Sequence, residues 1–264
     1  MTSSGGHEPG WRGVDLRLRE PVGEPAGALV LNHGRGADEN DLYGLLDAVD
    51  PERRLLGVTT GAPLVGIAPG GRHWYIVERV GFPHPETFAR SYAALGERLD
   101  GLLAARGLDW SRTLLGGFSQ GAVMSYALAL GAGRPLPAGL IALSGFVPEA
   151  EGWEPELAAR RDLPVYIHHG AADPVIGVGF ARDARERLQA AGIEPAYRET
   201  GAEHGVPPEL VSELREFAAL ATAEAPPAAG AVGAATPPVA APRAHSVDVV
   251  DGAVLADPDP NGSP

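Results

Sequence analysis

Residues 114–122 read Leu-Leu-Gly-Gly-Phe-Ser-Gln-Gly-Ala and join an apolar run to a pattern of small helical residues that extends to Leu130. Ser119 lies between Gly117 and Gly121, which is the Gly-x-Ser-x-Gly pattern of a serine on a sharp strand-to-helix turn. Such a turn strains the backbone of the serine, so its neighbours need to be almost free of side chains. It also places the serine at a helix N-terminus, where free N–H groups favour negative charge. The stretch therefore predicts a nucleophile; the alternative is a glycine-rich turn with an incidental serine.

The alternation of strand and helix continues on both sides of Ser119. Strands are predicted at 14–19, 28–31, 55–60, 112–118, 138–143, 163–168 and 195–199, and helices at 42–49, 86–105, 122–130, 180–191 and 207–220. Most of the predicted strands are continuous apolar runs, which is typical of parallel strands that are covered on both faces. The first strand instead alternates apolar and charged residues, which indicates a position near a sheet edge. We expect an α/β protein whose mostly parallel sheet carries helices on both faces.

The chain divides into three parts by composition. Residues 1–13 are predicted to be a flexible N-terminus, and residues 14–224 are predicted to form one α/β domain, since no stretch between strands is large enough for a second domain. Residues 225–264 are rich in alanine and proline and contain no aromatic residue. Such a segment buries too little apolar surface to offset its ordering entropy, so we expect a disordered tail. The alternative for residues 246–254 is a strand that pairs with a sheet edge.

Composition excludes several classes of function. The 264 residues carry a net charge of −13, which disfavours binding to nucleic acid or to an anionic membrane surface. The chain has no cysteine, which excludes disulfides, thiolate metal sites and a cysteine nucleophile. No apolar run approaches the ~18 residues of a membrane span. The N-terminus lacks the apolar segment of a secretory signal, so the expected location is the cytoplasm.

Three chemically reactive side chains follow predicted strands. Ser119, Asp173 and His204 each come shortly after a strand, and the loops after parallel strands gather at one edge of the sheet. Their order along the chain, Ser…Asp…His, is the order of α/β-hydrolases. A neutral imidazole would take the proton of the serine as it attacks, and the carboxylate would hold the imidazole in the required tautomer. We therefore predict a triad of Ser119, Asp173 and His204.

The other parts of this chemistry are predicted from position. An oxyanion needs two fixed donors, for which we expect the backbone N–H groups of Gln120 and of Arg35 on the loop after the first buried strand. His33 is expected to organise that loop. The adjacent His168 and His169 raise the alternative of a metal site, but no further ligand spacing supports one, and no metal is predicted.

Aromatic residues mark the predicted substrate pocket. Residues 61–85 form a long irregular connection that carries several large apolar side chains, among them Trp74. Long connections in compact domains are commonly functional, although such a loop also packs its own aromatics beneath it. We expect an open groove that is bordered by Trp74, Phe118, Phe146 and Phe180.

The motifs together resemble the phospholipase/carboxylesterase family, which includes bacterial carboxylesterases and acyl-protein thioesterases. The resemblance covers about residues 14–222 and is carried by His-Gly-Arg-Gly at 33–36, Gly-Phe-Ser-Gln-Gly at 117–121, His-Gly-Ala-Ala-Asp-Pro-Val at 169–175 and Glu-His-Gly at 203–205. It implies an α/β-hydrolase fold without a cap that hydrolyses esters or thioesters without a cofactor. Asn32 and Glu203 depart from the family pattern, which has an apolar and a small residue there.

The sequence leaves more than one function open. The first hypothesis is a carboxylesterase or lysophospholipase-like enzyme that acts on a small-molecule ester as a monomer or homodimer. Thioester hydrolysis and acyl transfer would use the same triad. A hypothesis of another class is a binding protein on an α/β-hydrolase fold without catalysis, although binding alone does not require an intact triad and oxyanion loop.

Overall fold

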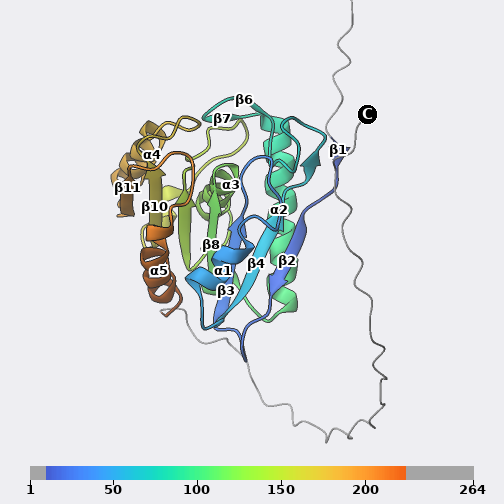
Figure 1. The fold of residues 1–264 in the computed structure, drawn as a ribbon, viewed down its shortest axis with the longest axis vertical. Coiled ribbons are helices and arrows are strands. Elements are labelled where there is room, and N and C mark those ends of the chain that lie inside the picture. Colours follow the sequence, from blue (N-terminus) through green and yellow to red (C-terminus); the bar gives the residue numbers. More distant parts are fainter. Residues whose placement is uncertain (1–9, 224–264) are drawn as a thin grey trace, which may run out of the picture. The chain divides into compact units, whose positions relative to one another are not determined.

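The computed structural model of the chain describes residues 10–223. A seven-stranded sheet in the order β11-β10-β9-β8-β3-β4-β2 forms its centre (Figure 1). Its strands are β2 (Asp15–Arg19), β3 (Gly27–Asn32), β4 (Leu55–Gly61), β8 (Thr113–Phe118), β9 (Gly139–Leu143), β10 (Val165–Gly170) and β11 (Ala196–Thr200). The edge strand β2 runs antiparallel to β4, and all other neighbours in this sheet are parallel. The carboxyl ends of the parallel strands therefore meet at one edge.

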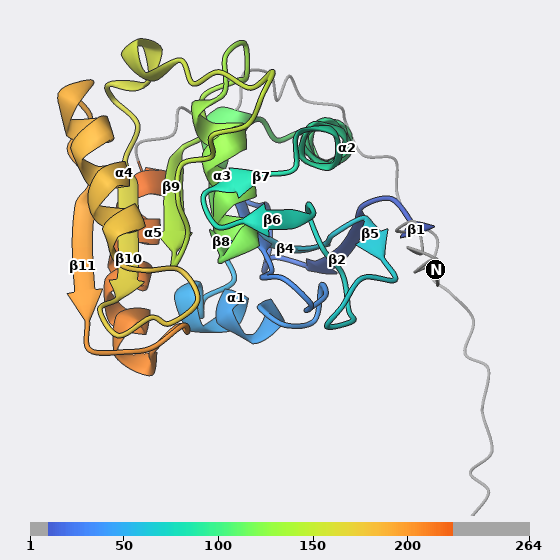
Figure 2. The same ribbon diagram turned by 90° about the horizontal axis from the view of Figure 1, so that it is seen from above.

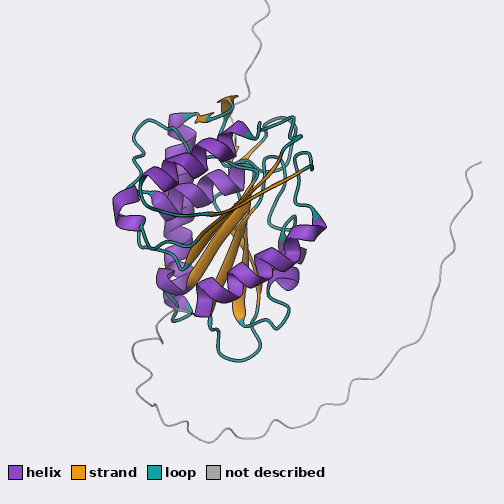
Figure 3. Cartoon of the chain, turned by 90° about the vertical axis from the view of Figure 1, so that its left-hand side faces the viewer, coloured by secondary structure: helices purple, strands orange, loops and turns teal. Residues whose placement is uncertain are grey.

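Five helices cover the two faces of this sheet (Figures 2 and 3). They are α1 (Tyr43–Val49), α2 (Pro85–Ala105), α3 (Gln120–Leu130), α4 (Gly179–Ala190) and α5 (Val211–Ala223). Figure 2 shows α2, α3 and α4 on one face and α1 with α5 on the other. Two apolar clusters divide in the same way. The predicted fold class, a mostly parallel sheet with helices on both faces, is confirmed.

Helix α3 is the most deeply buried helix, and its composition explains why it fits there. Every residue from Gln120 to Leu130 is buried, whereas α4 buries only one stripe of small and apolar residues. The first turn of α3 lies directly against the end of β3. A Cβ atom at Gly121 would therefore collide with the Asn32 carbonyl oxygen. A residue without a side chain is therefore required at this crossing.

The connection at 61–85 is more ordered than a plain loop. It contains β5 (Leu64–Val65), which pairs with β1 (Gly10–Trp11), and a hairpin of β6 (Val77–Arg79) and β7 (Phe82–Pro83). Part of the segment that was predicted as a flexible N-terminus, Gly10 and Trp11, is thus a strand, and Arg90 lies 3.8 Å over the Trp11 ring. These pairings are between strands of two or three residues, too short for a period-two pattern to appear in the sequence.

The boundaries of β10 differ from the prediction in a way that affects the site. This strand ends at Gly170 rather than at residue 168, because its ladder with β11 continues through the pair of Gly170 and Thr200. His168 and His169 are therefore buried strand residues. The predicted tail at 225–264, the possible strand at 246–254 and residues 1–9 lie outside the described residues. Between residues 10 and 223, no helix is long and apolar enough to span a membrane.

Replacing the glycine at the crossing of α3 and β3 should change the free energy of unfolding in the opposite direction from replacing an exposed glycine in α2. Gly121→Ala should lower the free energy of unfolding by about 2 kcal/mol or more, because the new methyl group meets the Asn32 carbonyl. Gly101→Ala is the control, because Gly101 lies at an exposed position near the C-terminal end of α2, where the added carbon would contact no neighbouring side chain. It should raise the free energy of unfolding by up to about 1 kcal/mol. Urea denaturation measures both, and equal stability of the two variants would contradict the steric explanation.

Candidate active site

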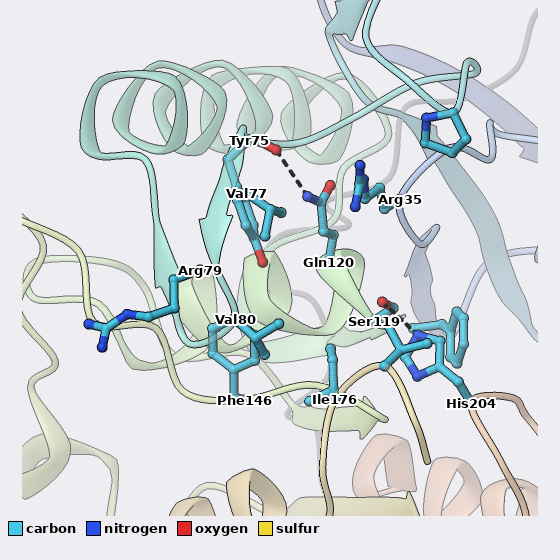
Figure 4. Close-up of a pocket in the computed structure, with 13 residues that line it drawn as sticks. Arg35, Tyr75, Val77, Arg79, Val80, Ser119, Gln120, Phe146, Ile176 and His204 are labelled. Atoms are coloured by element: carbon cyan, nitrogen blue, oxygen red, sulfur yellow. Dashed lines mark hydrogen bonds between the residues drawn. The ribbon is translucent and has the colours of Figure 1, made fainter.

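Ser119 lies on the turn between β8 and α3 in a conformation that few residues adopt. Its φ is 55° and its ψ is −122°, and its N–H donates to the Leu143 carbonyl at 2.9 Å. A Cβ at Gly117 would lie 2.5 Å from the Gly121 carbonyl carbon, so the tight turn requires a glycine there. The strain is held by the sheet and by α3, and it directs the hydroxyl toward an open cavity (Figure 4).

A chain of hydrogen bonds connects three of the predicted site residues. The Ser119 hydroxyl is 3.0 Å from His204 Nε2, and His204 Nδ1 is 2.6 Å from Asp173 Oδ2. The Phe118 ring lies 4.8 Å from the imidazole, centroid to centroid, and limits its movement. With Nδ1 donating to the carboxylate, Nε2 carries the lone pair that faces the hydroxyl. This is the arrangement in which an imidazole removes a proton from a serine.

Asp173 is held in the charged form by several donors. Its Oδ1 accepts the backbone N–H groups of Val175 at 2.8 Å and Ile176 at 2.9 Å. Burial alone would raise the pKa of Asp173, but the hydrogen bonds from His204 and from these two N–H groups lower it below the ordinary value. His169 Nε2 donates to the Ile176 carbonyl at 2.7 Å and lies 3.3 Å from Asp173 Oδ2. The carboxylate therefore has a fixed orientation toward His204.

The loop after β3 passes directly over Ser119. A Cβ at Gly34 would come within 2.9 Å of the Phe118 ring and 3.3 Å of the Ser119 Cβ. Arg35 follows on this loop and lines the same cavity as Ser119 and Gln120. Within residues 10–223, neither the Arg35 N–H nor the Gln120 N–H has a protein acceptor. The two residues whose N–H groups were predicted as oxyanion donors thus both line the cavity, and neither N–H is paired within the described part of the chain.

Trp74 does not border the cavity, in contrast to the prediction. It is completely buried, and its indole N–H donates to the His33 carbonyl at 2.9 Å. The side-chain amide of Gln120 explains this position of Trp74. Its Oε1 accepts the backbone N–H of Trp74 at 3.0 Å, and its Nε2 donates to the backbone carbonyl of Tyr75 at 2.9 Å. The side chain of Gln120 thus fastens the connection to α3, so that the next residue, Tyr75, reaches the cavity.

The cavity next to Ser119 has a volume of about 220 Å³ and mostly apolar walls. Phe118 and Phe146 line it as predicted from the sequence. Phe180 does not, because it packs behind Phe146 with ring centroids 5.3 Å apart. The remaining apolar lining, which sequence reasoning missed, consists of Pro69, Tyr75, Val77, Val80, Val175 and Ile176. Burial raises the pKa of Tyr75, so its hydroxyl stays protonated and remains a donor.

Buried polar side chains support the turn from beneath. Asn32 accepts the Thr60 hydroxyl at 2.6 Å and donates to the Ser125 hydroxyl at 2.9 Å, and Ser125 donates to the Gly121 carbonyl at 2.9 Å. Asn32, one of the departures from the family pattern, therefore joins β3 and β4 to the first turn of α3. Glu203, the other departure, is exposed to solvent.

His33 organises the loop over Ser119, as the sequence predicts. Its Nε2 accepts the Ala62 N–H at 3.0 Å, so its Nδ1 carries the proton that is donated to the Gly34 carbonyl at 2.6 Å. Burial lowers the pKa of His33 to about 4 and keeps the ring neutral. His168 is likewise buried, with its Nε2 3.0 Å from the Thr200 hydroxyl and its pKa lowered by burial to about 4. Across residues 10–223 no group of three metal-ligating side chains is found.

Comparison with known proteins identifies the family. Over residues 15–222 the chain matches the family described as phospholipase/carboxylesterase. Acyl-protein thioesterase 1 from Debaryomyces hansenii is 27% identical over 172 residues, which cover 61% of this chain and 73% of that protein. The Bacillus cereus carboxylesterase structure has a TM-score of 0.66 at 20% identity and covers 79% of this chain and 94% of its own. Esterase PE8 has a TM-score of 0.64 at 25% identity, with coverage of 78% and 98%.

The chain therefore belongs to the phospholipase/carboxylesterase family and has the α/β-hydrolase fold. The resemblance inferred from its motifs is confirmed over almost the same residues. Its esterase and thioesterase relatives support a hydrolase.

Two of the buried histidines, His33 and His168, predict how stability depends on pH. His33 and His168 have a pKa of about 4 in the folded protein, against 6.5 for the ordinary side chain, so the unfolded chain binds more protons between these values. The free energy of unfolding should therefore fall as the pH is lowered from 6.5 toward 4. Urea denaturation across this range should show a smaller fall for His168→Gln than for the wild type. Parallel curves would contradict the assignment, since the carboxylates titrate in both proteins.

Proposed function

We propose that this member of the phospholipase/carboxylesterase family is a serine hydrolase that cleaves carboxylic esters through an acyl-Ser119 intermediate. The observation that carries the proposal is the continuous hydrogen-bonded path from Asp173 through His204 to a strained serine at the wall of an apolar cavity. A binding protein would not need a buried carboxylate aligned on the imidazole. Family membership supports the same reaction class.

In the first half of the reaction His204 acts as a base. Its Nε2 takes the hydroxyl proton while the Ser119 oxygen bonds to the ester carbon, and the negative charge of Asp173 stabilises the imidazolium. The charge that develops on the carbonyl oxygen is taken up by the N–H groups of Arg35 and Gln120, and one such donor is worth about 3 kcal/mol in the transition state. The carbon–oxygen bond of the alcohol then breaks, and the alcohol leaves with the proton from His204.

In the second half water replaces the alcohol. His204 removes a proton from water as its oxygen attacks the acyl carbon, and the same proton returns to Ser119 as the acyl bond breaks. The products are one carboxylic acid and one alcohol, and the enzyme is restored. No residue of the path needs a cofactor for these proton transfers.

A thioester is the second candidate substrate. The acyl-protein thioesterases among the relatives favour it, and a thiol leaving group would use the same acylation step. The cavity of about 220 Å³ limits the acyl group to a small or medium size, and its edges are set by Tyr75, Val77 and Phe146. Kinetics with a matched oxygen ester and thioester of one acid distinguish the two, and alcohol acceptors in the same assay detect acyl transfer.

The triad predicts that Ser119 can be labelled covalently and that substitution of Ser119 abolishes the labelling. A fluorophosphonate probe should label Ser119 and no residue of Ser119→Ala, and Asp173→Asn should lower kcat by about 10⁴-fold, because an uncharged amide no longer fixes the tautomer of His204. Asp162→Asn is the matched control, because this exposed aspartate precedes β10 at the opposite edge of the sheet. Mass spectrometry of the labelled peptide and steady-state assays with aryl esters measure these effects. A folded wild-type protein that stays unlabelled would disprove the proposal.

The cavity walls predict a change in the preferred acyl length. Val80→Trp should shift the optimum of a para-nitrophenyl ester series to shorter chains by filling the cavity, and Phe146→Ala should shift it to longer chains. Trp74→Ala should destabilise the fold by about 3 to 5 kcal/mol without moving the optimum, since this side chain is buried away from the cavity. If neither cavity variant moves the optimum, these residues do not contact the acyl group.

A further inference from the structure

The cavity beside Ser119 carries positive charge in an otherwise acidic protein. The residues that line it include Arg35 and Arg79 but no aspartate or glutamate, whereas the whole chain has a net charge of −13. Cations along a largely apolar cavity produce a local field that attracts anions. The two arginines are found at different places. Arg35 lies on the loop over Ser119, whereas Arg79 ends strand β6 on the hairpin.

The charge of Arg79 is available to a ligand. Its guanidinium carbon lies 3.6 Å over the centre of the Phe82 ring, and its guanidinium N–H groups make no hydrogen bond to any residue between 10 and 223. No carboxylate among residues 10–223 lies within 4.0 Å of it. By comparison, Arg106 is paired with Glu20 at 2.7 Å and Arg182 with Glu199 at 2.7 Å.

The hairpin that carries Arg79 is anchored to the domain. Between β6 and β7, Gly81 has a φ of 94°, and a Cβ there would lie 2.8 Å from the Phe180 ring. Phe180 in turn packs on Phe146 in the cavity wall. The turn therefore rests directly on α4, which explains why Phe180 supports the wall instead of lining it. Arg79 is thus held at a defined place relative to the cavity.

The acyl group of an ester bound at Ser119 would extend toward Arg79. His204 must protonate the alcohol that leaves, so the alcohol lies on the His204 side of Ser119. Figure 4 shows Val80 and Phe146 on the other side of Ser119, with the Arg79 side chain beyond them. An acyl chain along these apolar residues ends near the guanidinium, where a carboxylate is favoured over a methyl group.

Building on the proposed esterase function, we propose that Arg79 determines specificity by binding a carboxylate at the far end of the acyl group. The preferred substrates are then monoesters of dicarboxylic acids of short or medium length. Val77, Val80 and Phe146 contact the methylene groups of such a chain, and Arg79 forms a charge-assisted hydrogen bond to its free carboxylate.

The test compares two esters that differ only at the end of the acyl chain. The para-nitrophenyl monoester of adipic acid carries a carboxylate where para-nitrophenyl hexanoate carries a methyl group. For the wild type, kcat/KM should be about fivefold to tenfold higher for the adipate monoester, mostly through KM. Arg79→Gln should remove this preference. The charge-matched control is Arg98→Gln on the exposed surface of α2, which should retain it. Added salt should reduce the preference in the wild type.

The ratio of the two rates separates this proposal from the proposed function. If the wild type hydrolyses neither ester, or if Ser119→Ala hydrolyses them equally well, the esterase function itself is wrong. If hexanoate is cleaved at Ser119 but adipate has no advantage, or if Arg79→Gln keeps the advantage, the role of Arg79 is wrong. A preference that disappears in Arg35→Gln and persists in Arg79→Gln would assign the anion to the loop over Ser119 and also overturn the proposal.

Discussion

The close approach of Gly121 to the Asn32 carbonyl is the contact on which the rest of the structure depends. It brings the first turn of α3 against the end of β3, with no space for a side chain between them. Because β3 continues into the loop that carries Gly34 and Arg35, the same contact brings that loop over Ser119. A strained serine, a helix N-terminus and the loop donors thus meet at one point through backbone packing, before any reactive side chain is considered.

Polar groups that are buried around this contact have partners, which keeps its geometry unique. Thr60, Asn32 and Ser125 form a path of hydrogen bonds between β4, β3 and α3. Gln120 satisfies one N–H and one carbonyl of the connection at 74–75. An alternative packing that moved the turn would leave these groups unpaired in the interior, at a cost of about 1 to 3 kcal/mol for each. The turn is therefore fixed by hydrogen bonds as well as by steric fit.

The sheet, its helices and the convergence of Ser119, Asp173 and His204 were predictable from the sequence, because parallel strands are long apolar runs whose following loops share one edge. The cavity wall was less predictable. A large apolar side chain in the sequence indicates that the residue is packed against other residues, but not whether it faces the cavity or the core. Trp74 and Phe180 were therefore both predicted to line the cavity. The hairpin at 77–83 has strands of two and three residues, too short for a periodic pattern. The role of the Gln120 side chain had no signal of its own, because an amide in a helix is ordinarily exposed.

The central sheet carries the three reactive residues, whereas a separate hairpin carries part of the cavity wall. The site therefore has one part that substitutions cannot move without disturbing the core and one part that they can change. Ser119, Asp173 and His204 follow strands of the central sheet, so a change that moves them also disturbs the core. Val77, Arg79 and Val80 belong to a hairpin outside that sheet, which rests on Phe180 through the turn at Gly81. Substitutions there change the size and charge of the cavity while the hydrogen-bonded path to Ser119 stays intact. The chemistry is consequently set by the packing of the sheet, whereas the choice of acyl group depends on one short hairpin and the aromatic pair beneath it.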